Sequence, residues 1–331
     1  MEFNLNKKMP LYKSVVQSII ENIKKGILKT DDKLPSINEL QSSLNVSRDT
    51  VIKSLYELRE LGYIVSVPGK GFYILTNDVK HKYHILLIMD TMRPYKEVFY
   101  KSFVDSIGER ALVDVHFHYH NLKLFKRLIE DNAGNYTHYA IMPFFDNDIS
   151  DIIKNIPQEK IILVDGDLPR ENNYTSIVQP FYHQTYSSLV KALPDLRKYN
   201  SFKISIHREF QFTPNSIIKG YVDFCNDYGF KYEICDPLND EDIVKGAAYL
   251  VVSDVCMVRV MEKAYSNNWE LGKDIGLIGF DDTPIRKILN RGVSVISTDF
   301  EKLGKNLCDI IINNRKEKIE NEFYFAQRST L

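Results

Sequence analysis

The sequence predicts an α/β protein in two unequal parts: a small N-terminal unit of three helices and a β-hairpin, then a large doubly wound domain. Two observations lead to this prediction. Apolar side chains over residues 11–75 recur first at helical spacing and then at strand spacing. From residue 85 onward, short apolar runs alternate with helical stretches, which is typical of parallel strands joined by right-handed crossovers. The polar segment 76–83 lies between the two patterns, so we expect domains over 1–78 and 79–331.

Three short helices are expected in the N-terminal unit. The first spans residues 11–27, where apolar residues recur every four positions. The second begins after Ser36, a capping residue with Glu39 at the capping-box spacing. After the turn at 45–46, Ser47 caps a third helix whose buried stripe is Val51, Leu55, Leu58 and Leu61. Three helices with one tight turn form a helix-turn-helix.

The spacing of apolar residues changes to two after Gly62. Residues 63–67 and 72–75 are therefore predicted strands of a hairpin, or wing, around Pro68-Gly69-Lys70-Gly71, whose glycines allow positive φ. A helix N-terminus offers free N–H groups and partial positive charge to phosphate, and a Gly-Lys-Gly tip can bring a cation into a narrow groove. The pattern points to nucleic acid.

Five linked motifs resemble the GntR family of bacterial winged-helix regulators. They are Pro10-Leu11-Tyr12, Leu34-Pro35-Ser36, Val46 to Val51, Leu58 with Gly62-Tyr63-Ile64, and Gly69 to Ile74. The resemblance implies that the partner is double-stranded operator DNA, contacted by Ser36, Ser47, Arg48, Thr50, Lys53, Gly69, Lys70 and Gly71. The family often has Arg two residues after the Pro-Ser step, where this chain has Asn38, so one DNA contact should differ.

Each of these residues also has a purely structural explanation. Ser36 and Ser47 are good helix caps without DNA, and the two tip glycines suit any hairpin. Charged residues such as Arg48 most often form a solvated face. The joint pattern carries the prediction, and the charge distribution agrees with it: residues 1–80 hold 12 Lys or Arg against 9 Asp or Glu, whereas the rest hold 31 against 35.

Eight apolar runs are expected to be strands of the large domain: 85–89, 113–117, 139–142, 161–164, 202–206, 249–252, 275–279 and 293–296. Nearly continuous apolar strands imply that helices cover both faces of the sheets. Doubly wound sheets bind ligands beyond the C-terminal ends of their strands. Carboxylates, an arginine and aromatic residues gather at those ends, over 90–95, 143–146, 165–167, 207–210, 253–254 and 281–282.

This mixture of side chains suits the hydroxyls and apolar faces of a sugar. The alternative is that Asp165, Asp254 and Asp281 are ordinary turn residues, because Asp is common after strands.

A second resemblance lies in the large domain. Asp274 to Asp282 (Asp-Ile-Gly-Leu-Ile-Gly-Phe-Asp-Asp), with 250–254 upstream and 293–298 before a helix containing Leu303-Gly304, resembles the effector domain of LacI and GalR repressors. That resemblance implies the fold of periplasmic sugar-binding proteins, with lobe one over about 83–176 plus 300–322 and lobe two over about 177–299. In this fold the lobes close on a sugar. The candidate effector-binding residues are then Arg93, Phe144, Asp165, Ser253 and Asp281, and Asp281 would bind sugar hydroxyls.

Two positions depart from this second family. It commonly has Asn where this chain has Ser253, and Arg three residues before Gly220, where this chain has Ile217. Loss of that Arg removes a bidentate clamp for hydroxyls, which favours an effector that is less hydroxylated on that side, such as a deoxy sugar.

The remaining signals are weak. His116, His118 and His120 would share one face of a strand, a spacing that can bind metal, but a polar edge strand is the simpler interpretation and we predict no metal site. The four cysteines form no CxxC pair. Without a phosphate loop, nucleophile elbow or HExxH motif, neither a cofactor nor an enzyme is predicted.

Taken together, these features predict a sequence-specific transcription regulator, a repressor of sugar-utilisation genes that bound sugar releases from its operator. A homodimer formed through the large domains would place two winged helices on a near-palindromic site. The absence of a long apolar run and of a signal peptide in residues 1–10 predicts a cytoplasmic protein with no membrane partner, and argues against a transport protein. An activator of the same architecture and a sensor of a non-sugar metabolite stay open.

Overall fold

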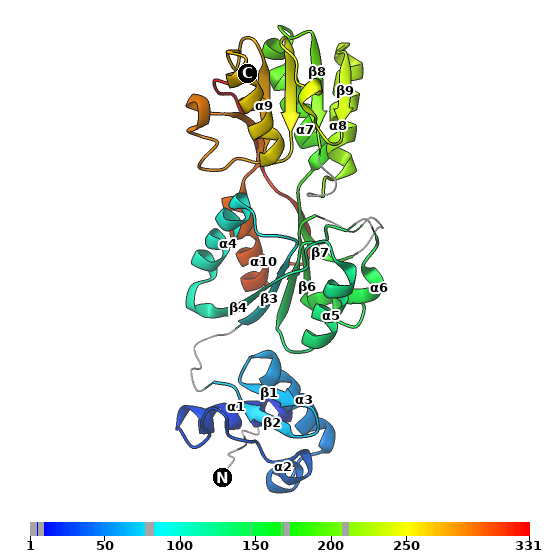
Figure 1. The fold of residues 1–331 in the computed structure, drawn as a ribbon. Helices are drawn as coiled ribbons and strands as arrows, with labels where there is room; N and C mark the ends of the chain where they lie inside the picture. The colour runs from blue at the N-terminus through cyan, green and yellow to red at the C-terminus, as the bar shows by residue number, and fades with distance from the viewer. Residues whose placement is uncertain are drawn as a thin grey trace.

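The computed structural model describes residues 5, 10–76, 83–145, 147–166, 168, 173–206 and 212–331. Three bodies follow one another along an elongated molecule: the N-terminal unit, then two α/β lobes (Figure 1). The predicted fold class is confirmed, because a helical unit with a wing precedes two separate sheets of mainly parallel strands.

The N-terminal unit contains three helices and one hairpin: α1 Leu11–Lys24, α2 Ile37–Leu44, α3 Arg48–Glu60, β1 Ile64–Val67 and β2 Gly71–Ile74. The apolar faces of the helices meet in one core. One end differs from the prediction, since α1 stops at Lys24 and not at Ile27. Gly26 turns the chain with φ +70°, which leaves Ile27 54% exposed and brings Leu28 into the core.

Lobe one is built on a six-stranded sheet in the order β13-β7-β6-β5-β3-β4. Its strands are β3 Tyr83–Met89, β4 Ala111–Phe117, β5 His138–Ile141, β6 Ile161–Asp165, β7 Thr175–Val178 and β13 Lys318–Glu320. Its helices are α4 Pro94–Ile107, α5 Leu122–Asn132, α6 Ser150–Ile153 and α10 Phe300–Asn313, with short 3-10 turns at Gly108–Arg110 and Gln158–Lys160. All neighbouring strands in this sheet are parallel.

Lobe two repeats the plan with the order β14-β12-β11-β10-β8-β9. Its strands are β8 Ser201–Ser205, β9 Tyr232–Cys235, β10 Ala247–Val251, β11 Gly276–Phe280, β12 Ser294–Thr298 and β14 Phe323–Ala326, of which β14 is antiparallel to β12. Its helices are α7 Phe181–Leu196, α8 Asn215–Tyr228 and α9 Asp254–Ser266, with 3-10 turns at Asp240–Asp242 and Leu289–Arg291.

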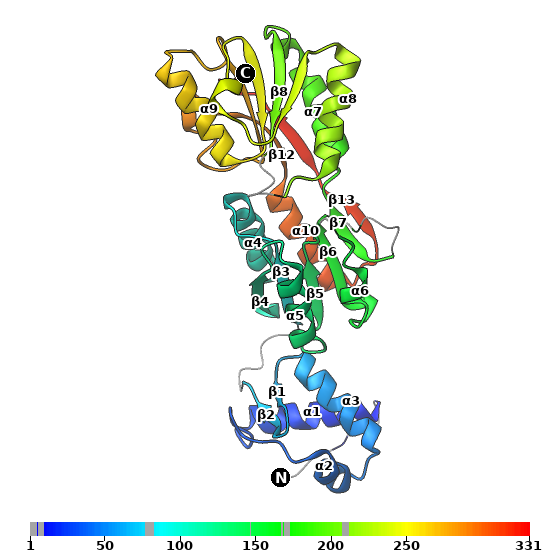
Figure 2. The ribbon, with the colours of Figure 1, turned by 45° about the vertical axis from the view of Figure 1, so that its right-hand side comes forward.

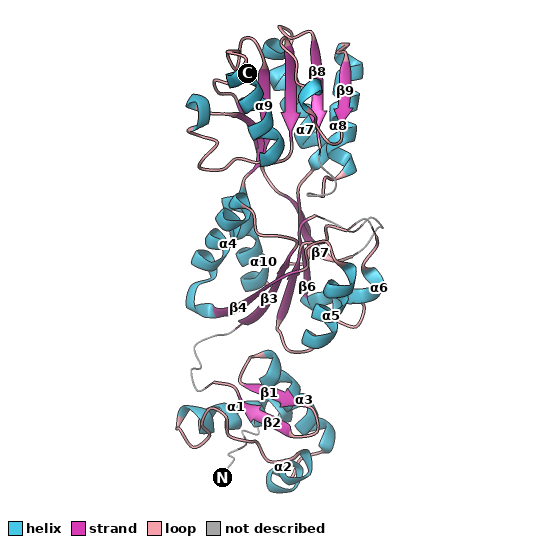
Figure 3. Cartoon of the chain, viewed as in Figure 1, coloured by secondary structure: helices cyan, strands magenta, loops and turns pink. Residues whose placement is uncertain are grey.

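Helices lie against both faces of each sheet (Figure 3), as the continuous apolar strands predicted. In lobe one, α4 and α10 pack on one face and α5 and α6 on the other. In lobe two, α7 and α8 cover one face and α9 the other. Each lobe therefore has its own double core, and the two sheets are held apart as separate bodies (Figure 2).

The chain crosses between the lobes three times, after β7, after β12 and between β13 and β14. Asn321, which is 2% exposed, lies in the third crossing and bonds to the other two. Its backbone N donates to Val178 O at 2.8 Å, and its side-chain amide donates to Thr298 Oγ1 at 3.0 Å and Asp299 O at 2.8 Å. Asn306 on α10 donates to its side-chain oxygen at 3.0 Å. A single buried amide thus ties the hinge strands together.

The N-terminal unit contacts lobe one through the C-terminal end of α3. Arg59 Nε donates to Gly134 O at 3.1 Å, and Glu60 forms an ion pair with Lys160 in which both side chains are mostly buried. Both contacts come from the same helix whose N-terminus carries Arg48. The orientation of α3 is therefore fixed directly against lobe one.

No helix among the described residues is both long enough and apolar enough to cross a bilayer.

Candidate DNA-binding surface and effector site

The N-terminus of α3 presents a cation and backbone donors to solvent. Ser47 caps the helix, because its Oγ accepts a hydrogen bond from Thr50 N at 3.2 Å and shares another with Thr50 Oγ1 at 2.8 Å. Arg48, the first helical residue, is exposed and has no ion-pair partner among the residues that the structure describes. A free helix N-terminus beside an unpaired guanidinium suits contact with phosphate and base edges.

Ser36 and Lys53 have structural partners of their own. Ser36 and Glu39 form the predicted capping box, with Glu39 N donating to Ser36 Oγ at 3.3 Å and Ser36 N donating to Glu39 at 2.7 Å. These hydrogen bonds lower the pKa of Glu39. The Lys53 ammonium lies 3.9 Å from the centre of the Tyr12 ring, a cation–π contact that ties α3 to α1. Lys53, which was predicted to contact DNA, therefore also makes a contact within the N-terminal unit.

The wing turn places Lys70 between two glycines with positive φ, +71° at Gly69 and +111° at Gly71. Residues with a side chain rarely adopt such φ values, so the glycines are required by the turn itself. A Cβ at Gly71 would lie 3.3 Å from Lys33 Cε, which shows that Lys33 lies along the wing. The sequence did not identify Lys33, because the bridge that pairs it with Tyr73 has no signature in residue spacing.

A cavity lies between the two lobes, beyond the C-terminal ends of their strands. The space inside it that the centre of a water-sized molecule can occupy is about 40 Å³, and all the space between its walls, open solvent at the mouth included, is about 420 Å³. The lining residues are Asp90, Arg93, Tyr95, Phe144, Asp165, Gln179, Phe181, Phe212, Pro214, Ile217, Val252, Phe280 and Asp281. Four of the five predicted effector residues, Arg93, Phe144, Asp165 and Asp281, are thus brought together. Gln179 was not predicted, since it directly follows β7, which is not among the strands predicted from the sequence.

The fifth predicted residue, Ser253, is not part of the cavity lining. Its Oγ accepts a hydrogen bond from Cys256 N at 3.2 Å and caps α9, while its neighbour Val252 faces the cavity. A Ser directly before a helix is used as a cap for the ordinary reason that the first helical N–H groups need acceptors. The predicted segment 207–210 and the single positions Asp146 and Asp167 lie outside the described residues.

Asp165 and Asp281 occupy equivalent places in the two lobes. Asp165 ends β6 and Asp281 follows β11, and these two strands hold the third position in their respective sheets. Both residues have left-handed backbones, with φ +71° and +69°. Asp is among the non-glycine residues that adopt this conformation most readily, and both residues line the cavity. The fold therefore points one carboxylate into the cavity from each lobe.

Burial governs the protonation of this carboxylate pair. Desolvation, with the charge of Asp165 added to it, raises the pKa of Asp281 to about 7. Desolvation also raises the pKa of Asp165 to about 6, against the opposing effects of Lys96 and of a 2.5 Å hydrogen bond from Gln179. Asp90 is buried too, but its ion pair with Lys96 keeps its pKa below the usual range.

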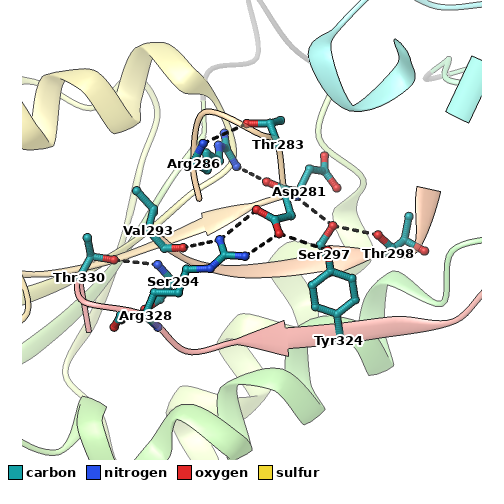
Figure 4. A network of polar contacts seen from close by, with 11 residues as sticks. Asp281, Thr283, Arg286, Val293, Ser294, Ser297, Thr298, Tyr324, Arg328 and Thr330 are labelled. Carbon is teal, nitrogen blue, oxygen red and sulfur yellow. Dashed lines mark hydrogen bonds and ion pairs between the residues drawn. The ribbon is translucent and has the colours of Figure 1, made fainter. Parts of the chain in front are cut away.

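Figure 4 shows how the loop after β11 is held in place behind Asp281. Arg328, near the C-terminus, pairs with both carboxylate oxygens of Asp282 at 2.9 and 2.6 Å, and Tyr324 donates to the same carboxylate at 3.3 Å. Arg286 donates to the backbone oxygen of Asp281 at 2.5 Å and pairs with Asp254. Arg328 and Arg286 thus form their ion pairs with Asp282 and Asp254, and the side chain of Asp281 lines the cavity.

The histidine run does not form the shared face that the sequence suggested. β4 is an edge strand as predicted, but it ends at Phe117, and Tyr119 and His120 have positive φ. His118 is buried against Phe145, with ring centroids 4.2 Å apart, and burial lowers its pKa to about 4. None of the three histidines belongs to a metal-ligand cluster within the described part of the chain.

The N-terminal unit matches a known family of bacterial regulators. Residues 11–74 match the sequence model of "Bacterial regulatory proteins, gntR family". Residues 11–74 are a GntR-family helix-turn-helix domain. Over this GntR-family domain, the chain is 40% identical to the transcriptional repressor YtrA of Bacillus subtilis across 68 residues, which is 20% of this chain and 52% of YtrA. It is 38% identical to the mannosyl-D-glycerate transport/metabolism system repressor MngR of Escherichia coli across 72 residues, 22% of this chain and 30% of MngR.

The large domain resembles other proteins in fold only. A LacI family transcriptional regulator of Lactobacillus casei with bound sucrose superposes with a TM-score of 0.62 at 12% identity, covering 75% of this chain and 99% of that one. The trehalose repressor of Escherichia coli superposes with a TM-score of 0.61 at 11% identity, covering 73% and 99%. The predicted fusion of a GntR-family head to a LacI-like body is confirmed, and these comparisons favour a regulator over an enzyme.

Proposed function

We propose that this protein is a transcription regulator whose GntR-family head binds operator DNA and whose two-lobed body binds a small sugar that releases it. One observation carries the proposal: the exposed Arg48 at the N-terminus of α3, which forms no ion pair with a described residue, and the carboxylate-lined cavity belong to one chain. We call α3 the recognition helix. The matched relatives include repressors, and two fold neighbours are a sucrose-bound regulator and a trehalose repressor, which supports a sugar effector. We propose that it acts in the cytoplasm.

The physical route from sugar to DNA runs through the hinge and α3. A sugar that contacts both lobes favours their closed arrangement, and Asn321 couples the three crossings that must bend together. Lobe one in turn holds the end of α3 through Arg59 and Glu60. Any rotation of lobe one in a dimer therefore changes the position of the recognition helix on its half-site.

The proposed homodimer has a candidate surface in lobe two. Val255 and Val258 on α9 are 62% and 44% exposed, and Ile285 and Ile288 in the loop after β11 are 54% and 75% exposed. The ion pair between Asp254 and Arg286 brings this loop against the start of α9. Exposed apolar side chains on adjacent elements can mark a protein–protein interface, and we propose that a second copy covers these four.

Replacing Ile288 with Asp should therefore convert the dimer to a monomer, because a charge would have to be buried without a partner in the interface. Size-exclusion chromatography with light scattering gives the molar mass directly. Ile234→Asp, on edge strand β9, is the matched control: Ile234 is 43% exposed but is not one of the four proposed interface residues. A dimer that tolerates Ile288→Asp but not Ile234→Asp would move the interface to the β9 edge.

The proposed function is tested by selecting binding sites for the full chain from random-sequence duplexes and then screening monosaccharides for release of the selected DNA. We expect enrichment of a sequence with two-fold symmetry and release by a sugar at a concentration that also raises the Tm of the protein. Failure to enrich any sequence would contradict the DNA-binding half. Release of the DNA only by non-sugar metabolites would contradict the proposed sugar effector and support the proposed regulator.

A further inference from the structure

Among the described residues, three carboxylates and one cation, Arg93, line the cavity between the lobes. Asp90, Asp165 and Asp281 line it, and their exposed fractions are only 5%, 1% and 8%. The buried ammonium at this site, Lys96, is already paired with Asp90. The charge of Lys96 also acts on Asp165 and Asp281, but neither of these carboxylates forms an ion pair with a described residue, and each belongs to a different lobe.

The other described charges near the cavity form no ion pair with Asp165 or Asp281. Arg286 acts on Asp281 through its charge, but its guanidinium is bound to backbone oxygens and to Asp254. His120 faces Asp90, with Nε2 at 3.7 Å from that carboxylate. Arg93 lines the same cavity; burial raises the pKa of Tyr95 there, and the charge of Arg93 lowers it to a smaller extent.

Two buried acceptors on the cavity wall also lack a donor among the described residues. Asp281 Oδ1 and Gln179 Oε1 have no hydrogen-bond partner, and both residues are more than nine-tenths buried. Buried acceptors in folded proteins are almost always satisfied by protein, water or ligand, so these two are available to a ligand that enters the cavity. That ligand must bring several N–H or O–H groups.

A bare metal ion does not fit these groups. Among the described residues, no arrangement brings ligand atoms of Asp90, Asp165 and Asp281 all within 4.8 Å of one another, and the cluster that meets this distance is Glu233, Cys235 and Asp242, near β9. A larger molecule can span the two lobes. The aromatic rings of Phe144 and Phe212, with centroids 5.7 Å apart, supply faces on which a sugar ring or a cation can lie.

We propose that the effector is an amino sugar or a related amino polyol, whose protonated amine binds between the carboxylates of Asp165 and Asp281. The ammonium donates hydrogen bonds to both lobes, so it offsets the repulsion that opposes their closure. The hydroxyls satisfy the remaining acceptors, and the apolar edge of the ring lies on Ile217, which is buried in the cavity wall. This inference rests on the proposed function and specifies its effector.

The test compares sugars of the same ring that differ in charge. The full chain is titrated with glucosamine, galactosamine and mannosamine, with their neutral parent hexoses, and with the corresponding hexuronates. At least one hexosamine should bind with a Kd at least about tenfold below that of its parent and its uronate, since a charge-assisted contact adds roughly 1.5–3 kcal/mol. Equal or tighter binding of the neutral hexose or the hexuronate, or no binding of any hexosamine, would overturn the proposal.

Variants and proton release separate this role from a structural one. Asp165→Asn and Asp281→Asn should each remove the preference for the amine, whereas Asp151→Asn, in which the replaced side chain is 93% exposed, should keep it. Because the pKa values of Asp165 and Asp281 are raised to about 6 and about 7, binding of an ammonium near pH 6 should ionise them and release protons. Calorimetry in two buffers of different ionisation enthalpy measures that release. Amine binding without it would contradict the proposal.

The outcomes also separate this inference from the proposed function. A hexosamine that binds with the expected preference but leaves operator binding unchanged would support the inference and contradict the regulatory switch. A neutral sugar that releases the operator would support the switch and overturn the inference.

Discussion

Asp281→Asn should yield a protein that binds operator DNA as tightly as the wild type but no longer releases it when the effector is added. Asparagine keeps the shape of the side chain and removes the charge that faces the cavity from lobe two. A hydrogen bond to a charged group contributes roughly 1.5–3 kcal/mol, so effector affinity should fall by roughly 10- to 150-fold. Fluorescence anisotropy of labelled operator during an effector titration measures both quantities.

The same variant should change the pH dependence of stability. The pKa of Asp281 is raised in the folded protein to about 7, so the folded state holds a proton that the unfolded state releases. The contribution of Asp281 to the free energy of unfolding should therefore fall as pH rises from about 4 to about 7, while His118 and His138, whose pKa values burial lowers to about 4, contribute with the opposite sign. Asp281→Asn should lack the fall, so the difference between wild type and variant should change with pH over this range. Thermal unfolding across that range, with Asp151→Asn as the exposed control, checks the sign. An Asp281→Asn protein that still responds at wild-type effector concentrations would contradict the role given to this residue.

Arg48→Ala should have the opposite effect: operator binding is lost while effector binding is kept. The guanidinium is exposed at the N-terminus of α3 and has no ion-pair partner in the described part of the chain, so its removal should not disturb the core. One specific base contact is worth roughly 1–3 kcal/mol, which is roughly 5- to 150-fold per half-site and acts twice in a dimer.

Electrophoretic mobility shift at fixed salt measures this loss, since DNA affinity depends strongly on salt. Arg127→Ala is the matched control, because the Arg127 side chain is 79% exposed on α5 and pairs with Asp131. An Arg48→Ala protein with wild-type operator affinity would show that α3 does not read DNA through its N-terminus.

The N-terminal unit could be predicted in detail because its signals are local. The capping box at Ser36 and the positive-φ glycines of the wing each depend on a few neighbouring residues. The predicted C-terminus of α1 was wrong by three residues. Ile27 continues the apolar spacing of the helix, but Gly26 turns the chain before it. Whether a residue is buried after such a turn depends on packing, which periodicity does not report.

In the large domain, several strands and side-chain contacts could not be predicted from local sequence patterns. The strands β7, β9, β13 and β14 were missed: β13 has only three residues, and β14 belongs to lobe two although it follows a strand of lobe one. The strand-end rule placed Asp165 and Asp281 at the cavity. The same rule could not show that Lys96 forms an ion pair with Asp90 or that Ser253 caps α9, because these contacts depend on the three-dimensional packing of the chain.

We propose that operator binding and effector binding are coupled through one conformational change, and a measurement of this coupling in both directions is the most direct test. The Kd of the effector found by the sugar screen is measured by calorimetry with the full chain alone and saturated with its operator duplex. If the effector weakens operator binding by a given factor, the operator must weaken effector binding by the same factor. We expect a change of roughly 5- to 150-fold, the usual range of coupling free energies. An effector Kd that is the same with and without operator would contradict the account.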